Sequence, residues 1–207
     1  MYPTHPTLLT VVTAGVDSRP VRIAERVGAA AFIAVLTAIA AQISVPLPFT
    51  PVPFTFQPMI VLLGGAVLGS RLGMMSQVLY LALGIAGLPV FAASSTLAPG
   101  AARLLGPTGG YLLSYPIAAF TAGWLAERGF DRRYLTSVAA MACGLALVFT
   151  CGVAGLAFFA GASRGFRDAV AAGFTPFIAA DLLKLLVAAA AMPALWSLVD
   201  RPNTSRN

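Results

Sequence analysis

Two charged residues, Asp181 and Lys184, stand in the otherwise apolar stretch PFIAADLLKLLVAAAAMPALW (176–196), and Lys184 is the only lysine of the chain. Their i, i+3 spacing puts both side chains on one face of a helix. Charges inside a bilayer are costly, so such groups pair, point into a helix bundle or face water. Two interpretations follow: an ion pair that only stabilises the bundle, or a polar ligand site.

The composition is that of an integral membrane protein. Of 207 residues, 58% are hydrophobic and 10% are charged, whereas soluble domains have about 25% charged residues. The net charge of +6 comes from arginines that lie mostly between apolar segments. This distribution indicates membrane topology and argues against nucleic acid as a partner.

Six apolar segments predict an all-α integral membrane protein with six transmembrane helices, because a bilayer core requires about 20 apolar residues per helix. The segments cover 27–45, 59–70, 71–88, 111–125, 135–160 and 176–199. We expect a mobile cytoplasmic tail over 1–20, one substrate-binding domain over 21–199 and a polar C-terminal tail over 200–207.

The arginine distribution predicts that the N and C termini are both cytoplasmic. In that orientation nine arginines lie inside and three, Arg103, Arg164 and Arg167, lie outside, in agreement with the positive-inside rule. Asp181 and Lys184 then lie toward the outer end of the last helix. The loops 45–58 and 89–110 face the same side.

The loop 89–110 contains Arg103 as its one charged residue and the glycine-rich segment GPTGG (106–110). Arg103 is either a solvated arginine or a ligand contact. The glycines allow the backbone to approach another group closely. The segment is therefore either part of a ligand site or a tight turn that starts the fourth helix. The segment lacks the lysine and the spacing of a phosphate-binding P-loop.

The first outer loop is rich in proline and phenylalanine and includes Phe54, Phe56 and Gln57. Aromatic side chains there either anchor the chain at the membrane interface or cover a ligand with an apolar body.

The first helix carries small residues at every fourth position, Ala30, Ala34 and Ala38. Such a face allows close helix packing, either with a partner protein or within this chain.

The sequence lacks the residues of common catalytic and metal sites. It has no HExxH, no CxxC and no Walker sequence, and its one histidine, His5, precedes the apolar segments. We therefore expect no metal, no bound cofactor and no enzymatic activity.

Four motifs, TPVPFTFQP, GLPVFA, LLGPTGGYLLSY and PFIAADLLK, together resemble the BioY family, the biotin-binding S components of energy-coupling-factor (ECF) transporters. The resemblance covers residues 22–198. It implies six transmembrane helices in the bacterial cytoplasmic membrane and a single biotin site near the outer face. It also implies two kinds of partner, a transmembrane coupling protein (the T component) and ATP-binding-cassette ATPases. The alanine face of the first helix matches the surface that S components use against the coupling protein.

The resemblance also implies roles for individual residues. Asp181 and Lys184 are expected to be polar ligand contacts. The chemistry of biotin independently suggests that Asp181 accepts hydrogen bonds from the ureido group, that Lys184 donates to the ureido oxygen or the carboxylate, and that Arg103, which lies outside the matched motifs, pairs with the carboxylate. The segment 106–111 is expected to form a pocket wall and the loop 49–57 a lid. The expected biotin contacts are Asp181, Lys184, Arg103, Gly106, Thr108, Gly109, Gly110, Tyr111, Phe54, Phe56 and Gln57.

Two functions are consistent with these residues. In the first, the chain captures biotin and partner ATPases drive its transport. In the alternative, the chain is a self-sufficient secondary transporter in which Asp181 binds a proton or sodium ion. The absence of an internal repeat disfavours the alternative.

Overall fold

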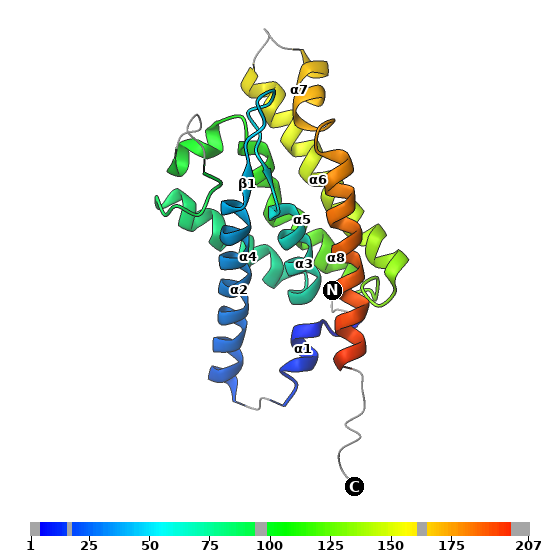
Figure 1. Ribbon diagram of the computed structural model, residues 1–207. Helices are drawn as coiled ribbons and strands as arrows, with labels where there is room; N and C mark the ends of the chain where they lie inside the picture. The colour runs from blue at the N-terminus through cyan, green and yellow to red at the C-terminus, as the bar shows by residue number, and fades with distance from the viewer. Residues whose placement is uncertain (1–4, 16–17, 94–98, 161–164, 200–207) are drawn as a thin grey trace.

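The computed structural model describes residues 5–15, 18–93, 99–160 and 165–199, and the predicted tail over 200–207 and Arg164 lie outside this range. The described part is predominantly helical (Figure 1). Its elements are α1 (Leu8–Val12), α2 (Arg19–Gln42), β1 (Ser44–Val45), β2 (Phe54–Thr55), α3 (Gln57–Leu68), α4 (Ser70–Ile85), the 3-10 helix η1 (Gly100–Leu105), α5 (Gly109–Ala126), α6 (Tyr134–Ala160), α7 (Phe166–Gly173) and α8 (Ile178–Val199).

Each predicted apolar segment forms a helix, in order α2, α3, α4, α5, α6 and α8. Among the described helices, three are long and apolar enough to cross a membrane: α2, α6 and α8. The 12 residues of α3 span only about 18 Å at 1.5 Å per residue. This short helix is enclosed by α2, α4, α5 and α8, which explains why its side chains at Val61 and Leu62 are fully buried.

Close contacts between small residues hold α5 at the centre of the bundle. The backbone of Gly110 in α5 lies against Cys151 and Gly155 in α6, and Gly65 in α3 lies against the backbone of Ala119. Side chains at these glycines would separate the helices. The tight packing of α5 therefore depends on small residues, as is common between membrane helices.

The alanine face of α2 packs inside the chain. Ala30 and Ala34 are buried, and Ala38 packs against the core in a helix that contacts α3 and α4. Of the two alternatives for this face, the structure shows packing within the chain. The assignment of these alanines as a partner-binding surface is thereby corrected.

The N-terminal segment is also packed rather than entirely mobile. Leu8 of α1 is 4% exposed and belongs to the core, and the His5 amide donates a 3.0 Å hydrogen bond to the Glu127 carbonyl. This burial corrects the expectation of a mobile tail over 1–20 for the residues around α1. Residues 1–4 and 16–17 of that tail lie outside the described range.

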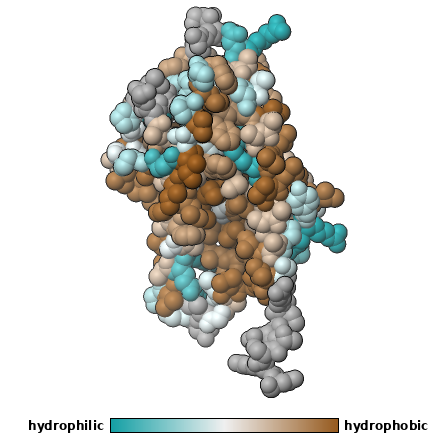
Figure 2. Space-filling view, in the orientation of Figure 1, coloured by the Kyte–Doolittle hydropathy of each residue, from teal (hydrophilic) through white to brown (hydrophobic). Residues whose placement is uncertain are grey.

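Residues 44–55, which include most of the first outer loop, form a short antiparallel hairpin in which Ser44 pairs with Thr55 and Val45 with Phe54. The hairpin and α7 lie at the upper end of the bundle in Figure 1, whereas α1 and the end of α8 lie at the lower end. Apolar residues dominate the face shown in Figure 2. Exposed large apolar side chains of the described residues include Phe32 of α2 and Leu183 of α8, as expected for surfaces that contact lipid.

Candidate binding site

A pocket lies at the end of the bundle that carries the hairpin. Segments far apart in the sequence line it: the hairpin, the start of α3, the loop after α4, η1, the start of α5, α6 and the start of α8. Its lining residues are Val52, Pro53, Thr55, Gln57, Pro58, Phe91, Ala92, Arg103, Thr108, Tyr111, Leu112, Tyr115, Val148, Phe149, Phe177 and Asp181.

The pocket is narrow in this conformation. Its cavity volume is about 60 Å³, within a hollow of about 600 Å³ that includes space open to the outside. At roughly 10–15 Å³ per water site, the cavity holds only a few water molecules. A larger ligand therefore requires lining side chains or the hairpin to move.

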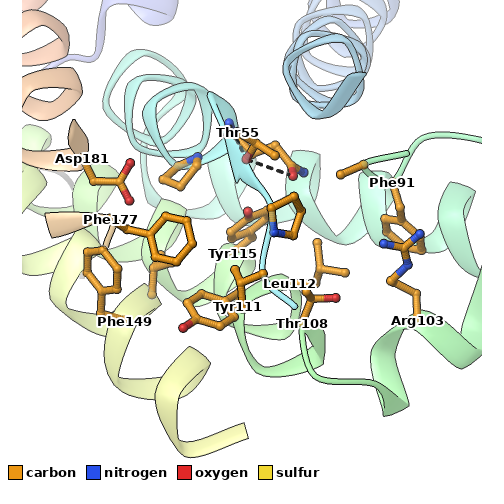
Figure 3. Close-up of a pocket in the computed structure, with 16 residues that line it drawn as sticks. Thr55, Phe91, Arg103, Thr108, Tyr111, Leu112, Tyr115, Phe149, Phe177 and Asp181 are labelled. Carbon is orange, nitrogen blue, oxygen red and sulfur yellow. Dashed lines mark hydrogen bonds between the residues drawn. The ribbon is translucent and has the colours of Figure 1, made fainter. Parts of the chain in front are cut away.

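Asp181 and Lys184 form a direct ion pair at one side of the pocket. Lys184 Nζ lies 2.7 Å from Asp181 Oδ1, and both residues are 7% exposed. Asp181 lines the cavity, and Figure 3 shows its carboxylate directed inward beside Phe177. The pair thus leaves a carboxylate available to the interior of the pocket.

Lys184 does not line the cavity but connects α8 to the hairpin. Its Nζ donates a 2.6 Å hydrogen bond to the Thr55 carbonyl and lies 3.4 Å from the ring centre of Phe54 and 5.1 Å from that of Phe56. The two phenylalanines predicted as ligand contacts therefore contact this ammonium group, and neither is among the cavity lining. Cation–π contacts of this kind stabilise a desolvated charge.

Gln57 lines the pocket as predicted and belongs to a buried polar network. Its Nε2 donates to Tyr80 Oη at 2.7 Å, Tyr80 donates to the Val90 carbonyl at 3.2 Å, and the Thr55 hydroxyl donates to Gln57 Oε1 at 3.3 Å. This network ties the start of α3 to α4 and to the following loop, so it holds one wall of the pocket in position.

Arg103 lies on the opposite side of the pocket from Asp181, with aromatic rings and Leu112 between them (Figure 3). It is 5% exposed, which excludes the solvated alternative. Burial lowers the pKa of its guanidinium from the usual value, and Tyr80 partly opposes this shift. An arginine stays protonated despite such shifts, so this side of the pocket carries a buried positive charge.

In the GPTGGY segment (106–111), two side chains line the pocket, whereas two glycines allow close packing of the backbone. Thr108 and Tyr111 line the cavity, and Tyr111 donates a 2.6 Å hydrogen bond to the Gly173 carbonyl. The buried hydroxyl of Thr108 has no hydrogen-bond partner in the described part of the chain. Gly106, Gly109 and Gly110 are absent from the lining, and the last two instead allow close contact with neighbouring backbone.

Several lining residues were not predicted from the sequence. Tyr115 lies one helical turn after Tyr111, a spacing that placed it on the same face. Phe149 and Phe177 stand in apolar segments that contain many similar residues, so no local signal distinguishes them. The Thr55 carbonyl accepts a hydrogen bond from Lys184, a backbone contact that a sequence motif does not reveal.

The arrangement fits a ligand with two different polar ends and an apolar middle. Asp181 can accept hydrogen bonds at one end, Arg103 can bind an anion at the other, and the aromatic walls can cover rings between them. Within the described residues, no group of three His, Cys, Asp or Glu side chains is placed to hold a metal ion.

Comparisons with known proteins agree with this fold. The family model described as the BioY family matches residues 11–201. "Probable biotin transporter BioY" of Pyrococcus horikoshii is 43% identical over 165 residues, which cover 80% of this chain and 92% of that protein. "Biotin transporter BioY" of Thermotoga maritima is 41% identical over 154 residues, covering 74% and 85%.

A crystal structure of the S-component for biotin from an ECF-type ABC transporter has a similar fold, with a TM-score of 0.76 and 24% sequence identity. The likeness covers 88% of this chain and 95% of that one. The resemblance seen in the four sequence motifs is thus confirmed over nearly the whole chain, and the protein belongs to the BioY family.

Proposed function

We propose that this protein captures biotin and serves as the substrate-specific subunit of an ECF-type, ATP-driven importer. The observation that carries the proposal is the polarity of the pocket, with Asp181 and Arg103 on opposite sides of an aromatic lining (Figure 3). Biotin has a ureido group at one end, a carboxylate at the other and fused rings between them. The named functions of the relatives and the S-component fold support the same conclusion.

The ion pair gives a mechanism for ligand entry. Lys184 holds strand β2 through the Thr55 carbonyl and donates a hydrogen bond to Asp181. The ureido N–H groups of biotin bind Asp181, and the ureido oxygen competes with Thr55 for Lys184. Release of Thr55 lets the hairpin shift and enlarges the narrow cavity.

Six transmembrane spans with both termini in the cytoplasm accompany this function. In addition to the three long spans, the helices α3, α4 and α5 cross the membrane. The arginine distribution orients the bundle in a cytoplasmic membrane. The pocket then faces outward, where it meets external biotin. A T component and ATPases supply the energy, since the sequence carries no Walker motif.

Binding and transport are tested separately with purified protein. We expect biotin, but not thiamine, to bind the chain in detergent, as measured by calorimetry. The Ser197→Ala variant is a suitable control for substitutions in the pocket and should bind biotin normally, because this exposed polar residue of α8 lies outside the pocket. Absence of biotin binding contradicts the proposed ligand.

In proteoliposomes we expect uptake only when the T component, the ATPases and ATP are present. Uptake by the chain alone along a proton or sodium gradient would instead support the secondary transporter with Asp181 as the ion site.

Replacing Arg103 with Gln is expected to weaken biotin binding by roughly 10- to 100-fold, because a hydrogen bond to a charged group contributes about 1.5–3 kcal/mol. The same variant should bind biotin methyl ester about as well as the unaltered protein does, since the ester carries no carboxylate. Calorimetry with both ligands measures this difference. An equal loss for acid and ester would show that Arg103 supports the pocket but does not recognise the carboxylate.

A further inference from the structure

A second cavity lies at the opposite end of the bundle, between α1, α2 and the turn that joins α3 to α4. Its volume is about 620 Å³, within the range of roughly 300–1,000 Å³ for small-molecule sites. It is therefore much roomier than the binding pocket and is not explained by biotin capture.

The charged lining of this cavity is mainly positive. Among the described residues, Arg26 and Arg71 line it together with one acidic residue, Glu127. The Glu127 carboxylate accepts hydrogen bonds from the Ser70 amide at 2.8 Å and from the Ser70 hydroxyl at 3.0 Å. For Arg26 and Arg71, no ion pair or side-chain hydrogen bond is found within the described part of the chain. Both guanidinium groups are thus available to an anion.

Apolar side chains line the cavity beside the arginines. Leu9, Leu72 and Met75 line it, and Met75 lies one turn after Arg71 on the same face of α4. Met75 is 53% exposed, and the exposed residues Val78 and Leu79 follow it along α4. An apolar surface of α4 therefore lies directly beside the two arginines of the cavity.

The two arginines also lie at the edge of the membrane in the proposed topology. Arg26 immediately precedes the apolar run that starts at residue 27, and Arg71 belongs to the first turn of α4. Both positions fall on the cytoplasmic side, at the depth of lipid headgroups. A soluble phosphate compound would use the arginines alone and would leave the apolar wall without a role.

We propose that this cavity binds one anionic phospholipid of the cytoplasmic leaflet, with its phosphate between Arg26 and Arg71 and an acyl chain along Leu72, Met75 and Val78. This inference rests on the membrane orientation given under the proposed function but not on biotin as the ligand. The lipid seals the gap between α1, α2 and α4 at the cytoplasmic end.

The test uses the full chain in detergent, titrated with phosphatidylglycerol or phosphatidylcholine, with bound lipid counted by native mass spectrometry. We expect one phosphatidylglycerol to bind in preference to phosphatidylcholine. Arg26→Gln and Arg71→Gln should each weaken phosphatidylglycerol binding about fivefold, the effect of roughly 1 kcal/mol per basic residue near a charged membrane surface. Binding of phosphatidylcholine should not change.

Arg22→Gln is the matched control. Arg22 lies one turn before Arg26 on α2, is exposed and is absent from the cavity lining, so this variant loses the same charge outside the site. Equal weakening by Arg22→Gln, or the absence of any preference for phosphatidylglycerol, overturns the proposal. Displacement of the lipid by glycerol phosphate would also overturn it in favour of a soluble ligand. Biotin binding by the same variants reports separately on the proposed function.

Discussion

The double variant Asp181→Asn with Lys184→Met is expected to fold with nearly the stability of the unaltered chain and to bind no measurable biotin. Lys184→Met alone should be less stable by about 3–5 kcal/mol, because it leaves a buried carboxylate without its partner. Both residues are 7% exposed, so water does not screen this penalty. Adding Asp181→Asn removes the uncompensated charge, and replacing a buried ion pair by neutral groups is often close to neutral for stability.

Thermal unfolding in detergent and calorimetry with biotin measure the two effects. Stability should fall in Lys184→Met and recover in the double variant, whereas biotin binding should be lost in both. Native biotin affinity in the double variant would show that the pair only stabilises the bundle. That outcome would restore the structural interpretation of Asp181 and Lys184 and would disfavour the proposed hairpin release.

Gly110→Ala is expected to destabilise the protein by about 1–3 kcal/mol or more, the usual range for overpacking. A Cβ atom at this position would overlap the carbonyl of Cys151 and lie 3.1 Å from Cα of Gly155. Both obstacles are backbone atoms of α6, so the two helices have to separate. Because α5 and α6 both line the pocket, at Tyr111 and Phe149, biotin binding should weaken as well.

Gly106→Ala is the control within the same GPTGG segment. Its φ is −93°, and a Cβ atom there would meet the Arg103 carbonyl at 3.4 Å, an ordinary contact. We expect its stability to lie within about 0.5 kcal/mol of the unaltered protein. Unfolding temperatures of the two variants provide the comparison. Equal stability of both would contradict the importance of backbone contact between α5 and α6.

Much of the helical framework was predictable from the sequence. The six apolar segments coincide with α2, α3, α4, α5, α6 and α8, because hydrophobic length and periodicity are local properties of the chain. The pairing of Asp181 with Lys184 was predictable for the same reason, since an i, i+3 spacing brings two side chains together on any helix.

The positions of partners from distant segments were not predictable. The Lys184 contact with the Thr55 carbonyl joins residues 129 positions apart. From the sequence alone, Arg103 could be either a solvated arginine or a ligand contact. The tertiary structure shows that it is buried opposite Asp181 (Figure 3). The direction of the alanine face likewise depended on which helices surround α2.

The physical reason is the range of the interactions involved. Helix position and the spacing of side chains on one helix follow from backbone geometry and hydrophobic pattern within a single segment. The pocket instead arises where the hairpin, η1 and four helices converge, and their packing depends on the shape of the whole core. Sequence therefore identified Asp181, Arg103 and Tyr111 as candidates, whereas tertiary packing brought them together with Phe149 and Phe177.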